Sequence, residues 1–139
     1  MQFRYLESTD PKSPNCLKTR SQNPDANEQA IVTDSTHCML VGPAKWTIRH
    51  VLDADVDVKE SKAGRIVIKV LPMSQPDLDA VRKLADDADG KDIAVLFQGR
   101  LYGPMPAGEL TRDREIRVTT DLAEPLARYV AKLMSASVV

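Results

Sequence analysis

Aromatic residues are scarce in this sequence, which has one tryptophan, three tyrosines and two phenylalanines among 139 residues. Proteins that bind single strands stack the bases on aromatic rings, so the scarcity argues against that function. Basic residues are not in excess either, because 19 lysines and arginines face 20 aspartates and glutamates and leave a net charge of −1. They form no basic stripe that could replace the counterions of a phosphate backbone. We therefore expect no nucleic-acid partner.

Long apolar segments are missing as well. The longest apolar runs, IAVLF at 93–97 and CMLVG at 38–42, have the length of strands, whereas a membrane-spanning helix needs about 20 residues. The opening MQFRYLES lacks the basic segment and apolar stretch of a signal peptide. We expect no transmembrane segment in this chain. If Met1 is the native start, the protein is cytoplasmic; a removed N-terminal segment would instead allow export or membrane anchoring.

Only two cysteines are present, Cys16 and Cys38, and they lack a CxxC spacing. A disulfide between them would close a polar loop of about 23 residues, with a stabilisation of about 3 kcal/mol. Two alternatives remain open: separate buried thiols, or a zinc site completed by His37 and His50. Adjacent His37 and Cys38 would point to opposite sides of a strand, which suits zinc poorly. We favour the disulfide, which would place the domain outside the cytoplasm.

No catalytic or metal-binding motif stands out. Neither histidine lies beside a G-x-S-x-G nucleophile motif, and the dispersed glycines form no phosphate loop. The alternating aspartates at 53, 55 and 57 resemble the start of a calcium loop, but Val58 and Gly64 replace its required glycine and glutamate. We interpret these aspartates as the solvated face of a strand, and we expect no catalytic residues, cofactor or metal.

The first half of the chain predicts mainly strands. Residues 8–30, rich in proline, serine, asparagine and aspartate, are typical of a polar loop. Gly42-Pro43 is expected to break the chain, and the mixed apolar spacing of 46–54 indicates a helical turn or two. Alternating patterns predict strands over 2–6, 30–42 with a turn at 34–35, 55–61 and 64–71.

The second half gives stronger signals. Ser74 is a candidate N-cap for a helix that ends near Gly90. A hairpin over 93–106 follows, with Gln98-Gly99 as its two-residue turn, and then a strand over 115–120. The last helix is expected over 121–134, with an apolar stripe of Leu122, Leu126, Tyr129, Val130 and Leu133 as its buried face.

This order of elements predicts the fold class. Strand, helix, hairpin, strand and helix follow one another from residue 65, which is typical of an α+β two-layer sandwich. We expect a mostly antiparallel sheet with two main helices on one face. The length fits a single domain over 1–139, with 8–30 as its polar loop.

Several segments together resemble a known family. MLVGPA at 39–44 is similar to an LLGPA motif, GKDIAVLFQGRLYGPMP at 90–106 to a G-k-AIVLDGKVVSAP hairpin, and EIRVTTDLAEPLARYVAKLM at 115–134 to a final strand and helix. The opening MQFRYLES resembles the first strand of mature actinobacterial proteins with such a domain. These are features of the head of the first extracytoplasmic domain of SecD and SecDF, membrane subunits of protein export. The resemblance covers 38–134.

The resemblance implies a SecD-head-like fold, an extracytoplasmic setting and contact with other polypeptides. Gln98-Gly99 stands where the family has Asp-Gly, and Gly103 stands where it has serine. No membrane helices follow in this sequence, so the proton-linked chemistry of SecD does not transfer. The family has no catalytic residues in this domain to carry over.

These observations predict a non-enzymatic protein-interaction domain of the bacterial cell envelope, lipid-anchored, secreted or cut from a longer protein. A lone tryptophan is most often a packing anchor, but a partly exposed one is a natural contact residue for a protein partner, and the hairpin exit from Tyr102 to Pro106 is a candidate rim for docking another chain. The predicted binding residues are Trp46, Tyr102, Pro104, Met105 and Pro106. The alternative is a small metal-dependent or Cys/His hydrolase built on His37, Cys38, His50 and the aspartates.

Overall fold

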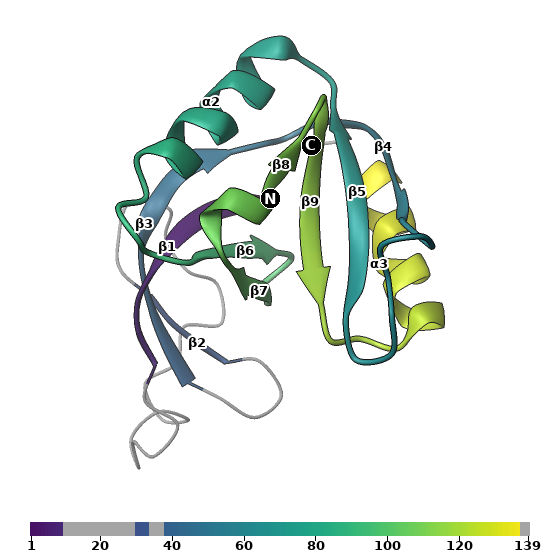
Figure 1. The fold of residues 1–139 in the computed structure, drawn as a ribbon, viewed down its shortest axis with the longest axis horizontal. Helices are drawn as coiled ribbons and strands as arrows, with labels where there is room; N and C mark the ends of the chain where they lie inside the picture. The colour runs from purple at the N-terminus through teal and green to yellow at the C-terminus, as the bar shows by residue number, and fades with distance from the viewer. Residues whose placement is uncertain (10–29, 34–37, 137–139) are drawn as a thin grey trace.

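The computed structural model describes residues 1–9, 30–33 and 38–136, which form two sheets and two α-helices (Figure 1). The larger sheet has the order β2 (Ala30–Thr33), β3 (Cys38–Thr47), β1 (Gln2–Thr9), β6 (Ile93–Phe97) and β7 (Arg100–Met105). The smaller sheet has the order β4 (Val51–Val56), β5 (Ile66–Pro72), β9 (Glu115–Thr120) and β8 (Thr111–Arg112). The helices are α2 (Gln75–Asp86), α3 (Glu124–Ala136) and a 3₁₀ turn, η1 (Ala107–Glu109).

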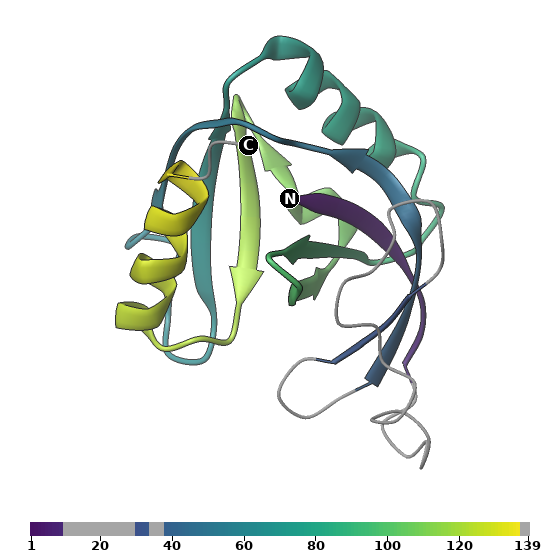
Figure 2. The same ribbon diagram turned by 180° about the vertical axis from the view of Figure 1, so that it is seen from behind.

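The predicted α+β class, with antiparallel pairing and two main helices, is confirmed. The strands are divided between two sheets, which meet where β7 contacts β9. Helix α3 packs on β4 and β5 of the smaller sheet, whereas α2 contacts β3 of the larger sheet as well as β5, β8 and β9. The two helices therefore cover different parts of the sandwich (Figure 1, Figure 2). Neither helix has the length and apolar character needed to cross a bilayer.

The helical turn predicted over 46–54 is wrong, because β3 runs on to Thr47 and β4 begins at Val51. Gly42 and Pro43 do not break the chain either. The register of β1 with β3 shifts between Arg4 and Leu6, so these two residues of β3 stand opposite Tyr5 alone. Such a β-bulge is one of the few places where a sheet accepts proline.

The hairpin at 93–105 is buried on both faces. All five residues of β6 are buried, as its unbroken apolar run predicts. One face joins the main core between the sheets and helices. The other face joins a second cluster within the larger sheet, which consists of Met39, Val41, Ala94, Leu96 and Leu101. The edge strands of this sheet, β2 and β7, curl toward each other and come into contact.

Arg4 is a fully buried cation beside this second cluster. Its Nη1 donates to the carbonyl of Gly42 at 3.0 Å. Its Nε and Nη2 donate to Oε1 of Gln2 at 3.0 and 2.8 Å. The bond to Gly42 ties β1 to β3 next to the bulge, and the two bonds to Gln2 lie within β1. This agrees with the rule that buried charges need partners.

Helix α2 forms as the sequence predicts. Ser74 adopts an extended conformation, and its Oγ accepts from the N–H of Asp77 at 3.3 Å, which makes it the N-cap. Its apolar side faces the core through Leu78, Val81 and Leu84. The hydroxyl of Tyr5 donates to the carbonyl of Leu84 and so fastens the helix to the larger sheet.

The buried face predicted for α3 is wrong in part. Leu126 and Tyr129 are 42% and 59% exposed, and the helix instead buries Ala127, Val130, Ala131 and Met134. The two alanines bring the helix close to the edge strand β4. There the Oγ of Ser135 accepts from the N–H of Ala54 at 2.9 Å. The face of α3 that approaches β4 therefore carries small residues, and the larger Leu126 and Tyr129 lie outside it.

The turn between β6 and β7 is the predicted two-residue turn. Gln98 and Gly99 both have positive φ, 51° and 75°, as a type I′ turn requires. Replacing Gln98 with asparagine should raise the free energy of unfolding by about 0.5–1 kcal/mol, because asparagine tolerates this conformation better. The free energies of unfolding of Q98N and Q98A, measured in urea, separate the conformational preference of asparagine from the loss of the glutamine side chain. Equal stability of Q98N and Q98A would contradict it.

Candidate functional site

The structure separates the five residues predicted to bind a partner. Trp46 is at the surface, 37% exposed, and its Nε1 donates to Oδ1 of Asp77 at 2.9 Å. Tyr102 and Met105 are only 4% and 1% exposed, which corrects their placement on a contact surface. A register shift around Gly103 and Pro104 pairs Met105 with Ile93 and turns its side chain into the core. Pro104 is half-buried and Pro106 is exposed.

The predicted disulfide lies outside the described residues, because neither Cys16 nor the side chain of Cys38 is among them. His37, which the alternative hydrolase and zinc sites require, lies outside them too. His50 is exposed between β3 and β4. Within the described part of the chain, no group of three or more histidine, cysteine, aspartate or glutamate side chains could hold a metal ion. The disulfide stays a prediction.

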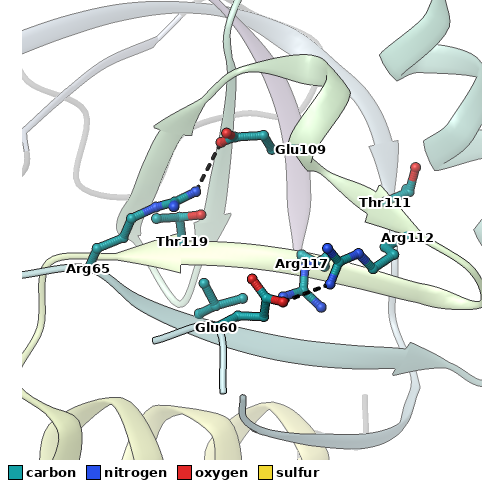
Figure 3. A pocket seen from close by; sticks show the side chains of 8 residues that line it. Glu60, Arg65, Glu109, Thr111, Arg112, Arg117 and Thr119 are labelled. Carbon is teal, nitrogen blue, oxygen red and sulfur yellow. Dashed lines mark hydrogen bonds and ion pairs between the residues drawn. The ribbon is translucent and has the colours of Figure 1, made fainter. Parts of the chain in front are cut away.

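A polar hollow of about 180 Å³ lies on the smaller sheet, and we name it the arginine groove (Figure 3). Strands β5 and β9 pair Val67 with Thr119 and Lys69 with Arg117, so these side chains share one face. The apolar residues between them face the main core. The groove is lined by Glu60, Arg65, Val67, Glu109, Thr111, Arg112, Arg117 and Thr119.

Arg117 is the buried cation of this groove, with 8% of its surface exposed. Its Nη2 lies 3.1 Å from Oδ2 of Asp57, and its Nη1 lies 3.3 Å from Oε2 of Glu115. Burial by itself raises the pKa of Asp57. The hydrogen bond and charge of Arg117 and the backbone N–H of Glu60 outweigh burial and hold the pKa of that carboxyl below its usual value.

Two further ion pairs form the rim of the groove. Arg65 contacts Glu109 at 3.1 Å, and Arg112 contacts Glu60 at 3.0 Å (Figure 3). Every arginine that lines the groove thus has a carboxylate partner, and an incoming anion would have to displace one. We interpret the groove as the charged outer face of the sheet, which stabilises the turn that carries Asp57 and Glu60.

Sequence reasoning missed two further exposed apolar residues, one in β4 and one directly after β5. Leu52 and Met73 are 63% and 59% exposed. Leu52 is the extra residue between the Val51–Pro72 and Asp53–Leu71 pairs, so it bulges from β4. Met73 follows Pro72 directly and precedes the N-cap of α2, the helix end to which Trp46 is bonded. We name Trp46, Leu52 and Met73 the Trp46 surface.

No sequence signal could have identified this surface beyond Trp46 itself. Leu52 belongs to a pattern that resembles core, and only the bulge turns it outward. Comparison of the chain with models of protein families, with curated proteins and with solved structures gave no match. The resemblance to the SecD head stays a prediction, and function must be argued from the surface.

Proposed function

We propose that this chain is a non-enzymatic interaction domain of the bacterial cell envelope, and that it binds a polypeptide partner through the Trp46 surface. The observation that carries the proposal is that three large apolar side chains are exposed on the segments where β3 leads into β4 and β5 leads into α2. Grouped apolar residues on a protein surface are typical of contact sites, and tryptophan is prominent among residues that dominate binding.

Trp46 is also held in place before any partner arrives. The hydrogen bond from Nε1 to Asp77 fixes the indole against the first turn of α2 and satisfies its only donor. A partner would therefore contact an ordered ring, and less side-chain entropy would be lost on binding. Flexible Met73 beside it can adapt to different apolar side chains. This combination suits a polypeptide with exposed apolar residues, as the resemblance to the SecD head implies.

The envelope setting of the proposal rests on the predicted Cys16–Cys38 disulfide and on the resemblance. Mass measurement of the purified protein before and after thiol alkylation tests the disulfide. A pair of free thiols in protein prepared under oxidising conditions would count against an extracytoplasmic domain.

Binding can be followed with the protein's own fluorescence, because Trp46 is its single tryptophan. We expect a tryptophan-free, permanently unfolded polypeptide to shift the emission of Trp46 to shorter wavelength and to protect it from acrylamide. Leu52→Ser and Met73→Ser should each weaken this binding about tenfold, which is about 1.4 kcal/mol.

Val58→Ser is the matched control, since Val58 is as exposed as Leu52 but lies in the loop between β4 and β5. It should leave the affinity unchanged. Equal losses in all three variants would indicate unspecific adhesion. No change in emission at high polypeptide concentration would remove the Trp46 surface from the proposal.

A further inference from the structure

A second apolar surface lies on α3, the helix at the outer edge of the molecule (Figure 1, Figure 2). Leu126, Tyr129 and Leu133 are spaced i, i+3 and i+7, which places them on one side of the helix. Leu126 and Tyr129 are largely exposed, while Leu133 is half-buried. We name these three residues the α3 stripe. Their spacing is that of the seam between two packed helices.

A pocket lies at the N-terminal end of the same helix. Its volume is about 520 Å³, and it lies between the loop after β4 and the segment that leads from β9 into α3. Val58, Ile66 and Leu122 supply its large apolar side chains, and Val58 is 63% exposed. The helix therefore presents a ridge along its length and a hollow at one end.

The charges near the α3 stripe are self-complementary. Asp121 lines the pocket at the start of the helix, and Lys132 lies near its end; both are exposed. Neither takes part in an ion pair within the described residues. By contrast, Arg128 is already paired with Glu124 at 2.8 Å and lies 3.8 Å from Asp55. Asp121 and Lys132 thus offer opposite charges near the two ends of the helix, and exposed Lys62 lines the same pocket as Asp121.

We propose that the α3 stripe binds a second copy of this chain, with the two α3 helices antiparallel about a two-fold axis. Tyr129 of each copy then packs against Leu126 of the other. Leu133 of each copy arrives beside Leu122 and the pocket, where a hollow can receive it. Asp121 of each copy faces Lys132 of the other. A ridge, a hollow and opposite charges at its two ends satisfy the self-complementarity that a two-fold interface requires.

The antiparallel order is favoured over the parallel one by charge. A parallel pair would place Lys132 beside Lys132 and Asp121 beside Asp121, whereas the antiparallel pair matches opposite charges twice. It also sets the two helix dipoles against each other favourably. One pair of helices of 13 residues buries less than the roughly 1,600 Å² of a standard interface. We therefore expect a dimer that dissociates at micromolar to millimolar concentration.

Sedimentation velocity over a range of protein concentrations tests the association. We expect the wild-type chain to sediment increasingly as a dimer as its concentration rises. The variants Tyr129→Glu and Leu126→Glu should remain monomeric up to a concentration at least tenfold higher than the one at which the wild type dimerises. Leu52→Glu is the control, because it places the same charge on a leucine of the Trp46 surface that is 63% exposed, against 42% for Leu126 and 59% for Tyr129. It should dimerise as the wild type does. Circular dichroism verifies that each variant is folded.

Charge reversal tests the antiparallel register. Asp121→Lys and Lys132→Asp should each weaken dimerisation, and the double variant should regain most of it. A wild-type chain that stays monomeric at millimolar concentration would overturn the proposal, as would dimers that persist in Tyr129→Glu. Failure of the double variant to recover would overturn the antiparallel arrangement. The proposal is independent of polypeptide binding, because the Leu52 and Tyr129 variants report on different surfaces.

Discussion

Replacing Gly103 with alanine should lower the free energy of unfolding by about 2–4 kcal/mol. The residue has φ of +87°, in a region that costs an L-residue about 1–2 kcal/mol. A Cβ there would also lie 3.2 Å from the backbone nitrogen of Met105 and 3.3 Å from the carbonyl oxygen of Ile93. Both atoms belong to paired strands, so they cannot move without disturbing the register of the hairpin. Urea unfolding followed by circular dichroism measures the loss.

Two other glycines separate conformational strain from crowding. Gly64 has φ of +81° but no atom within 4 Å of its added Cβ, so Gly64→Ala should show the strain alone, about 1 kcal/mol. Gly108 has neither a positive φ nor a close neighbour, and Gly108→Ala should be nearly neutral. If Gly103→Ala lowers the free energy of unfolding no more than Gly64→Ala does, crowding of the added Cβ against Met105 and Ile93 contributes nothing to the loss.

The sequence predicted elements whose signals are local. Ser74 and the stripe that follows it define α2, and the turn residues Gln98 and Gly99 define the hairpin. Pro43 was expected to break the chain but lies within β3. It is accepted there because β3 pairs with β1, and no local sequence pattern reveals that pairing. The division of the strands into two sheets has the same origin, because bulges and curling are properties of paired strands.

The candidate sites were harder to predict, because exposure is decided by what packs against each residue. Tyr102 and Met105 look like contact residues, but the larger sheet turns them into the core. Leu126 and Tyr129 look like core, but two alanines on the neighbouring side of α3 take their place. Trp46 and Pro106 were both predicted at a surface and are found exposed. The hydrogen bond of Trp46 with Asp77, 31 residues away, had no sequence signal.

Replacing Arg117 with alanine should cost about 3 kcal/mol of stability, because it leaves a largely buried carboxylate without its cation. The side chains of Arg117 and Asp57 are only 10% and 14% exposed. The rim pairs offer matched controls: Arg65→Ala and Arg112→Ala break ion pairs that are about half exposed, and each should cost at most about 1 kcal/mol. Equal losses in the three variants would show that burial of Arg117 has no special role.

The pH dependence identifies Asp57 as the group that Arg117 compensates. Because the folded-state pKa of Asp57 lies below its unfolded value, its contribution is complete above the unfolded pKa and is lost as pH falls below about 4. Without Arg117, only the backbone N–H of Glu60 and the charge of Lys69 oppose burial, so the pKa of Asp57 is higher in the variant than in the wild type and its protonation destabilises the variant less. The stability difference between wild type and Arg117→Ala should therefore narrow from pH 6 to pH 3. Adding Asp57→Asn to Arg117→Ala should restore part of the stability at pH 6, and a difference that stays constant with pH would exclude Asp57 as the partner that matters.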